Sequence, residues 1–294
     1  MKPSLKFNKN GIFKIVQFTD LHEGPNVDET IKLMNRILDY EKPNLVVLTG
    51  DITDNKCKSS EDVIKVITNI AAPMEERHIP WAVIFGNHDD EHGMMSKKEM
   101  LQLYMSFKWN ISQIGYKPFN RIGNYNLLIR SSKDDNPIFN IYMIDSGKNA
   151  PFIIPGYNWI TCSQIRWYKQ KAASLKRKYK KVIPALMFFH IPLQEFWKAW
   201  MDGIISGKRL ENECCPIINS GLFNALVKTG DVKGVFVGHD HLNNYCASLK
   251  GIKLGYGGHT GYGGYGRADA PHCARVFLIN ESQPESFTTW IREE

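Results

Sequence analysis

The sequence predicts an α/β fold in a single domain, and three observations support this prediction. Short apolar runs alternate with segments of helical period from the N-terminus onwards. Hydrophobic residues make up 43% of the chain and aromatic residues 12%, a composition typical of globular proteins with a substantial core. No linker, internal repeat or change in composition divides residues 1–294. Because strands that alternate with helices are typical of βαβ units, we expect parallel strands within one domain.

The N-terminal part of the chain contains three predicted strands and two predicted helices. The strands are short apolar runs, and the helices carry apolar residues three and four positions apart. In chain order these elements are residues 13–20, 28–42, 44–51, 60–78 and 81–88. Pro43 and Pro80 stand directly before the second and third strands, where the preceding helices must already have ended.

The rest of the chain adds a hairpin and then returns to the alternating order. NYNLLIRS and FNIYMIDS are separated by the polar stretch SKDDNP, so a hairpin is expected from about residue 124. Further elements are expected as a helix within 166–181, a strand at 184–190, a helix at 219–230 and a strand at 233–241. The tail, with ARVFLIN and SFTTWIREE, has the pattern of strands again.

Positive charge is concentrated in residues 166–181. This segment holds eight Lys and Arg residues and no Asp or Glu, whereas the formal net charge of the whole chain is +7. Ile165, Tyr168, Ala172, Leu175 and Tyr179 form the packing face of an amphipathic helix. We interpret the lysines as a solvated face; the alternative is an anion-docking surface, whose nucleic-acid affinity would fall steeply with salt. Confinement of the charge to one helix disfavours a nucleic-acid partner.

Three features of the sequence bear on the cellular compartment of the protein. No run of about 18 apolar residues could span a bilayer. The N-terminal segment MKPSLKFNKNGIFKIVQFTD lacks an apolar core followed by a small-residue cleavage site, the pattern of a signal peptide. The six cysteines are scattered, without a CxxC pair or zinc-finger spacing, which favours reduced thiols. We therefore expect a cytoplasmic protein, and the sequence does not fix its oligomeric state.

Acidic, amide and imidazole side chains gather where five predicted strands end. The motifs FTDLH, LTGDITD, FGNHDDE, FFHIP and VGHDH supply Asp20, His22, Asp51, Asp54, Asn87, His88, Asp89, His190, His239 and His241. Ligands of open α/β sheets bind at the carboxyl ends of strands, so these side chains should converge on one crevice. Each residue alone could be a helix cap, a turn residue or a surface histidine. Their joint occurrence predicts a metal site.

The types of side chain narrow the choice of metal. Carboxylates and imidazoles suit first-row transition ions such as Zn, Mn and Fe, whereas an all-cysteine set would indicate structural zinc or an iron–sulfur centre. Two ions about 3.5–4 Å apart could each bind a phosphoryl oxygen and hold a deprotonated water in line for attack. Such a pair needs more ligands than one ion can use, and the chain supplies seven candidates.

In their order and spacing, DLH, GDITD, GNHD, FHIP and GHDH resemble the five motifs of the calcineurin-like metallophosphoesterases, over residues 13 to 245. HIPLQEF, NSGLFNALVKTGDVKGVFVGHDHLNNYC and GYGGHTGYGGYGR are similar to the purple-acid-phosphatase-like branch. The resemblance implies a four-layer α/β/β/α sandwich with two divalent or trivalent metal ions at the strand ends.

The resemblance also implies a role for each candidate residue. The ligands of the two ions would be Asp20, His22, Asp51 and His241 for one, and Asp51, Asn87, His190 and His239 for the other. Asp51 would thus bridge them. Asp54 would orient His88, which would stand beside the phosphate and assist the leaving oxygen. A metal-bound hydroxide would be the nucleophile, since a bound metal lowers the pKa of water to about 7.

Two departures from related patterns limit this picture. Purple acid phosphatases place an iron-binding tyrosine at the end of the second motif and lack a histidine in the first, whereas this chain has Asp54 and His22. A purple iron–tyrosinate centre is therefore not expected, and Fe, Zn and Mn all stay open. Serine/threonine protein phosphatases place a phosphate-clamping arginine where this chain has Asn55. That change argues against protein phosphatase activity by the same route.

The glycine-rich stretch GYGGHTGYGGYGR contains a GxGxxG match at Gly261, Gly263 and Gly266. The match lies outside any strand–helix unit, so it does not indicate a dinucleotide fold. We interpret the stretch as a flexible loop beside the site, from which His259 and Arg267 could touch the substrate phosphate; the alternative is turn chemistry that simply needs glycine.

These observations together predict an enzyme, a phosphatase or phosphodiesterase with a phosphoester substrate. Two alternatives stay open: a catalytically silent scaffold that binds metal, and a nuclease with the same chemistry. The segment between His190 and Asn219 is expected to overhang the cleft and to influence the choice of substrate, because it lies between two ligand-bearing motifs.

Overall fold

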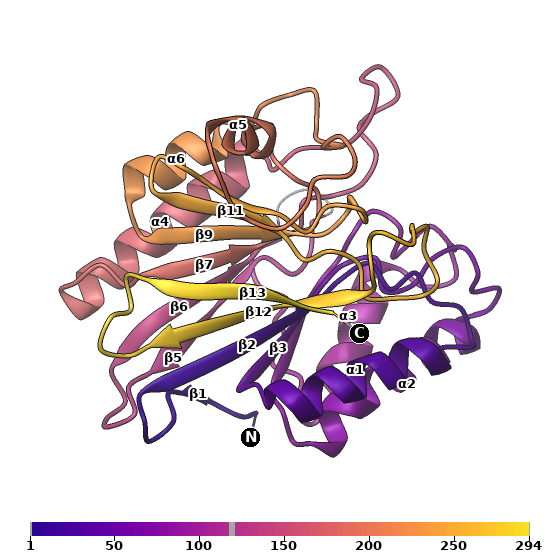
Figure 1. The fold of residues 1–294 in the computed structure, drawn as a ribbon, viewed down its shortest axis with the longest axis horizontal. Coiled ribbons are helices and arrows are strands. Elements are labelled where there is room, and N and C mark those ends of the chain that lie inside the picture. The colour runs from indigo at the N-terminus through magenta and orange to yellow at the C-terminus, as the bar shows by residue number, and fades with distance from the viewer. Residues whose placement is uncertain (1, 118–120, 294) are drawn as a thin grey trace.

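The computed structural model describes residues 2–117 and 121–293, and two β-sheets packed face to face form its centre (Figure 1). Alternate residues of the strands point to opposite sides of a sheet. Ile15 and Val47 face the other sheet in the larger core, whereas Val16 and Leu48 lie in the second core with the helices of residues 28–106. This arrangement confirms the predicted α/β/β/α sandwich.

The smaller sheet carries the first three predicted strands. Its order is β13-β12-β2-β3-β4. The bounds are β2 Ile12–Phe18, β3 Leu45–Thr49, β4 Trp81–Ile84, β12 Cys273–Asn280 and β13 Phe287–Glu293. Strands β2, β3 and β4 are parallel, as predicted, and β12 pairs antiparallel with both β2 and β13. The C-terminal hairpin therefore completes a sheet that the N-terminal strands begin.

The larger sheet has the order β1-β5-β6-β7-β9-β11-β10-β8. Its bounds are β1 Leu5–Lys6, β5 Tyr125–Arg130, β6 Pro137–Met143, β7 Ala185–Phe188, β8 Ile204–Ser206, β9 Val232–Val237, β10 Cys246–Leu249 and β11 Ile252–Tyr256. The predicted hairpin is the antiparallel pair β5 and β6, and β6, β7 and β9 run parallel. The candidate motifs after β7 and β9 thus leave this sheet in one direction.

In the described part of the chain, six helices cover the outer faces of the sheets. They are α1 Asp28–Glu41, α2 Ser60–Glu76, α3 Lys97–Ser106, α4 Cys162–Tyr179, α5 Glu195–Asp202 and α6 Leu222–Thr229. Helices α3 and α5 were not predicted from the sequence. The signal for α3 is a capping box, in which Ser96 and Glu99 each bond the other's backbone N–H. Helix α5 buries Phe196 and Ala199, so part of the segment expected to overhang the cleft packs into the fold instead.

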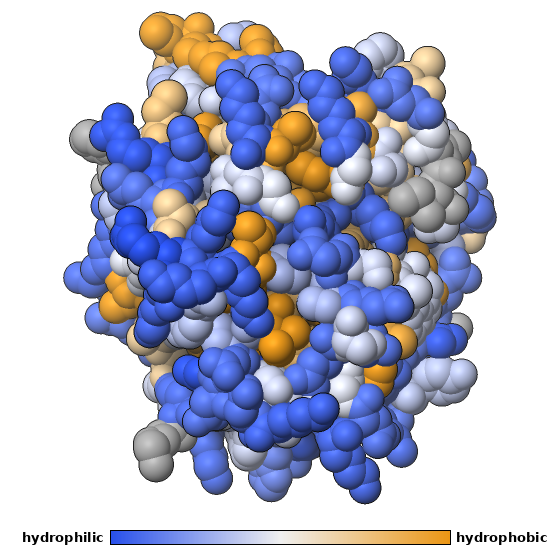
Figure 2. All heavy atoms as spheres, turned by 90° about the vertical axis from the view of Figure 1, so that its left-hand side faces the viewer, coloured by the Kyte–Doolittle hydropathy of each residue, from blue (hydrophilic) through white to orange (hydrophobic). Residues whose placement is uncertain are grey.

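Helix α4 contains the basic segment. Tyr168 and Ala172 are buried as predicted, while Leu175 and Tyr179 are half-buried. None of the eight Lys and Arg residues at 166–181, all of them described, forms an ion pair. Figure 2 faces the side of the molecule at the left of Figure 1, and hydrophilic side chains cover most of that face. Within the described ranges, no helix is long and apolar enough to cross a membrane.

Candidate metal centre

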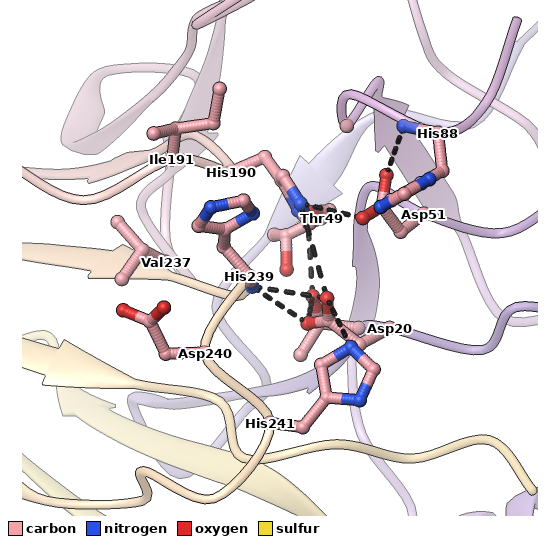
Figure 3. A network of polar contacts seen from close by, with 12 residues as sticks. Asp20, Thr49, Asp51, His88, His190, Ile191, Val237, His239, Asp240 and His241 are labelled. Atoms are coloured by element: carbon pink, nitrogen blue, oxygen red, sulfur yellow. Dashed lines mark hydrogen bonds and ion pairs between the residues drawn. The ribbon is translucent and has the colours of Figure 1, made fainter. Parts of the chain in front are cut away.

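The loops that follow β2, β3, β4, β7 and β9 meet at one end of the two sheets. They bring together the side chains predicted from the strand-end motifs, and in Figure 3 His190 and His241 point toward the carboxylates of Asp20 and Asp51. Backbone hydrogen bonds join the first two loops: the N–H groups of Leu21 and His22 both donate to the carbonyl of Asp51, at 2.8 and 2.9 Å. The convergence expected from the carboxyl ends of the strands is therefore observed.

The backbone of these loops is strained at the candidate residues. Asp20, His22, Asp51 and His239 have φ values of 55°, 50°, 52° and 80°. Non-glycine residues rarely adopt this left-handed region, because Cβ crowds the backbone. Strain of this kind persists where surrounding structure enforces it, and it concentrates at functional sites.

The candidate side chains fall into two buried groups. Asp20, His22 and His241 form one, and Asp51, His190 and His239 form the other, with the potential ligand atoms of each group within 4.8 Å of one another. Asp51 also faces both groups, since its Oδ2 lies 2.9 Å from His190 Nε2 and 3.6 Å from His22 Nε2. A single carboxylate between two groups could bridge two ions.

Unpaired polar atoms point into this space. Asn87 Oδ1 and His239 Nε2 are buried, and no described group forms a hydrogen bond with them, while His190 Nε2 faces the carboxylates of Asp51 and Asp20 at 2.9 and 3.9 Å. Buried polar atoms without partners are costly, so each needs an explanation such as an ion. His190 and His241 turn their other nitrogen, Nδ1, to the carbonyls of Thr49 at 2.9 Å and Tyr265 at 2.8 Å. These carbonyls hold Nδ1 as the protonated nitrogen and leave Nε2 free to bind a metal.

The charges in the site favour a cation. Burial alone would raise the pKa of Asp20, but the charge of His190 and a hydrogen bond with His241 outweigh it and lower that pKa to about 2. Burial likewise opposes protonation of His190, yet the nearby Asp51 and Asp20 raise its pKa to about 9. Burial and the charge of His190 lower the pKa of His239 to about 3. The carboxylates are thus ionised, and a metal could replace the proton that balances them.

Glycines let the loops approach one another closely. A Cβ atom on Gly86 would lie 2.1 Å from Asp51 Oδ1, and one on Gly238 would lie 2.3 Å from Asp20 Oδ2. The glycine-rich stretch is packed in the same way, because Cβ atoms on Gly261 and Gly263 would lie 2.1 Å from Leu21 O and 1.9 Å from His22 O. The expectation of a flexible loop is therefore replaced by a close backbone-to-backbone contact behind His22.

The pairing predicted between Asp54 and His88 is not found. The Nδ1 atom of His88 lies 2.5 Å from Glu91 Oε2 instead. A turn in which the Glu91 N–H donates to the His88 carbonyl brings this carboxylate to the ring. Among the described residues, the polar contacts of the Asp54 side chain are with Lys56 and with His22. Both His88 and Asp54 nevertheless line the pocket in front of the two groups.

The two residues suggested as phosphate contacts lie elsewhere. His259 is 1% exposed, its Nδ1 lies 2.9 Å from the carbonyl of His241, and its ring stacks on the imidazole of His241 from behind. Arg267 is exposed and pairs with Asp269 at 2.8 Å. Neither residue lines the pocket. Both suggestions are therefore corrected: the glycine-rich loop packs His259 behind a candidate ligand and leaves Arg267 in solvent.

Two tyrosines of the site were missed from the sequence, and so was Glu91, whose contact with His88 is described above. Tyr157 lines the pocket with its ring edge against His239, at a centroid distance of 4.3 Å, and Tyr265 stacks on His241 at 3.9 Å. Asp89 is buried, and its carboxylate accepts backbone N–H groups from Gly86, Asp51, Ile52 and Thr53. The two tyrosines had no local signal in the sequence, whereas Asp89 was already expected at this strand end from the FGNHDDE motif.

Comparisons with known proteins agree with this geometry. The model of the calcineurin-like phosphoesterase family matches residues 13–243. The chain is 34% identical to probable inactive purple acid phosphatase 29 of Arabidopsis thaliana, over 98% of this chain and 84% of the relative. It is 33% identical to phosphatase DCR2 of Saccharomyces cerevisiae, over 86% of this chain and 49% of that protein.

A solved structure shares the fold. The crystal structure of a dimetal phosphatase from Danio rerio superposes with a TM-score of 0.61 at 14% identity, covering 94% of this chain and 98% of that one. The order of the motifs, the sandwich of two sheets and the family match over most of the chain lead to one conclusion. The chain belongs to the calcineurin-like phosphoesterase family, and its relatives place it beside the purple acid phosphatases.

Proposed function

We propose that the protein is a metal-dependent phosphoester hydrolase with two metal ions. The observation that carries this proposal is the pair of buried ligand groups, with Asp51 of one group facing His22 of the other. One ion would be held by Asp20, His22, Asp51 and His241, and the other by Asp51, Asn87, His190 and His239. Bound transition ions would polarise the phosphoryl oxygens and supply a hydroxide near neutral pH.

The chain's own residues have separate tasks in this proposal. The carbonyls of Thr49 and Tyr265 fix the orientation of His190 and His241. His88 lines the pocket, its side chain is 36% exposed, and its ring lies 5.0 Å from that of His22. In this proposal His88 would donate a proton to the leaving oxygen of a phosphoester bound in front of the metals.

The silent-scaffold alternative has one observation in its favour. The Arabidopsis relatives carry the words "probable inactive" in their names, whereas the yeast relative is named a phosphatase. This chain has all seven candidate ligands, and two of their atoms, Asn87 Oδ1 and His239 Nε2, are buried without a hydrogen-bond partner in the described ranges. A complete ligand set favours an active centre over a scaffold. A cytoplasmic location stays part of the proposal.

Metal content and activity should be measured separately. Purified protein should bind about two equivalents of Zn, Mn or Fe and hydrolyse an aryl phosphate or a bis-aryl phosphate, and His88→Ala should lower turnover about 100-fold without loss of metal. Metal binding without hydrolysis of any ester would support the scaffold, and degradation of DNA or RNA would support a nuclease. Equal rates for wild type and His88→Ala on both esters would remove His88 from the mechanism.

A further inference from the structure

Two carboxylates stand at the pocket, and each faces a different histidine. Glu91 Oε2 lies 2.5 Å from His88 Nδ1, within the turn closed by the Glu91 N–H and the His88 carbonyl. The backbone N–H of His88 also donates to Asp51 Oδ1 at 2.8 Å. The backbone and the ring of His88 are thus both fixed, the ring by a residue only three positions away.

Asp54 is held toward the other histidine. Its Oδ2 lies 3.6 Å from His22 Nδ1, and its two oxygens accept the backbone N–H and the ammonium group of Lys56, both at 2.8 Å. The same ammonium group donates to the carbonyls of His22 at 2.7 Å and Gly263 at 2.6 Å. Lys56 therefore fastens Asp54, the backbone of His22 and the glycine-rich loop together, which leaves Asp54 directed at the ring of His22.

A carboxylate beside Nδ1 decides what the opposite ring nitrogen can do. Glu91, at hydrogen-bond distance, holds the proton of His88 on Nδ1, and the charge of Asp54, 3.6 Å from His22 Nδ1, favours the proton on that nitrogen, so each Nε2 keeps its lone pair. For His22, Nε2 faces the candidate metal groups, 3.6 Å from Asp51 Oδ2 and 3.1 Å from His241 Nε2. For His88, the contact with Glu91 leaves Nε2 as the nitrogen that can serve the pocket.

We propose that Glu91 is the positioning residue of His88 and that Asp54 is instead the positioning residue of His22 as a metal ligand. These two pairings differ from the pairing of Asp54 with His88 that the family resemblance implies. The catalytic role of His88 in this proposal rests on the proposed function. Each half of the proposal predicts a distinct defect. Loss of the Glu91 carboxylate should alter the ring of His88, and loss of the Asp54 carboxylate should weaken metal binding.

Glu91→Gln and Asp54→Asn separate the two halves, with Glu76→Gln on the exposed end of α2 as a control for a lost surface charge. Imidazole 15N NMR reports which nitrogen of His88 carries the proton, and titration with Zn reports affinity. Glu91→Gln should change the His88 signals and leave Zn affinity within about twofold. Asp54→Asn should leave those signals unchanged and lower Zn affinity about 10–100-fold. Neither measurement requires an active enzyme.

Kinetics add a test of the catalytic half. In Glu91→Gln, kcat should fall about 10-fold or more for a phenyl or alkyl ester, because the leaving oxygen of these esters needs a proton. For a 4-nitrophenyl ester kcat should fall less, and KM should be unchanged for both kinds of ester. If the wild type binds metal and hydrolyses nothing, the proposed function fails while the NMR and Zn measurements still decide the pairing. The proposal is overturned if Asp54→Asn shifts the His88 signals, or if Glu91→Gln lowers Zn affinity and leaves them unchanged.

Discussion

Strained backbone occurs in two regions of the molecule, and the residues in the two regions differ in kind. Eight described non-glycine residues have positive φ values. Four of them carry candidate metal ligands: Asp20, His22, Asp51 and His239. The other four stand at element ends or turns: Lys42 and Lys180 after α1 and α4, His78 after α2, and Lys250 between β10 and β11.

The two regions differ in the interactions that stabilise the strained backbone. After α1, the left-handed conformation of Lys42 only lets its N–H reach the carbonyl of Leu38, a task that glycine performs at lower cost. At the site, the strained residues are tied by side chains, as when the His239 N–H donates to both oxygens of Asp20 at 3.0 Å. Strain at a helix end is incidental, whereas strain at the site places a ligand. Substitutions in each region should therefore have opposite effects.

The largest effect is expected at Asp51. Asp51→Asn keeps an oxygen for the His88 N–H but removes the charge between the two ligand groups, so hydrolysis should fall about 1,000-fold or more. Steady-state kinetics with an aryl phosphate and metal analysis of the same sample measure the loss. Near-normal activity at normal metal content would show that Asp51 does not bridge, and the contrast between the regions would disappear.

A smaller effect is expected from crowding the site backbone. In Gly86→Ala the new Cβ would lie 2.1 Å from Asp51 Oδ1, so the free energy of unfolding should fall by about 2–3 kcal/mol and metal affinity should fall as Asp51 moves. Gly93→Ala is the control for crowding, because Gly93 has open space around it, and its φ of +69° adds a backbone cost that Gly86 does not have. It should cost about 1 kcal/mol and leave metal affinity alone. Urea denaturation measures the free energy of unfolding and titration measures metal affinity. If Gly86→Ala and Gly93→Ala lost equal amounts of both, close packing at Gly86 would have no special role.

The smallest effect, of opposite sign, is expected at the end of α4. Lys180→Gly relieves a left-handed residue with φ 58°, and it should raise the free energy of unfolding by about 0.5–1 kcal/mol with no change in activity. Lys180→Ala removes the same charge but retains the strain, so thermal unfolding of the two variants separates backbone from charge. If Lys180→Ala raised the free energy of unfolding as much as Lys180→Gly, the stabilisation would come from the loss of a positive charge in the basic segment and not from the backbone.

The parts of the molecule that could be predicted were those encoded locally. Strand periodicity, the prolines before β3 and β4 and the polar residues at the strand ends are all read within a few positions, and they were sufficient for the α/β class and for the convergence of the candidate ligands. The family resemblance supplied the sandwich, which the two cores confirm. The metal ligands themselves stay predictions, supported by burial and by unpaired atoms.

The parts that could not be predicted depend on contacts between distant segments. His259 is buried because its loop rests on the backbone of Leu21 and His22, about 240 positions earlier in the chain. Asp54 turned out to face His22 because Lys56 bonds the carbonyl of Gly263, another distant residue. The contact between Glu91 and His88 is local. However, both Asp54 in GDITD and Glu91 in GNHDDE could contact the His88 ring, and sequence spacing alone does not decide between them.

The position of β2 in its sheet has a consequence for how the chain folds during synthesis. Strand β2, which leads into Asp20 and His22, lies between β3 and the late strand β12, with Val16 opposite Val276. One edge of β2 therefore has no partner until residues 273–280 have left the ribosome. An open apolar edge is a template for pairing with other chains, and pairing over such a separation closes slowly. Nascent chains of this protein should thus depend on chaperones until β12 arrives, and the candidate site should form last.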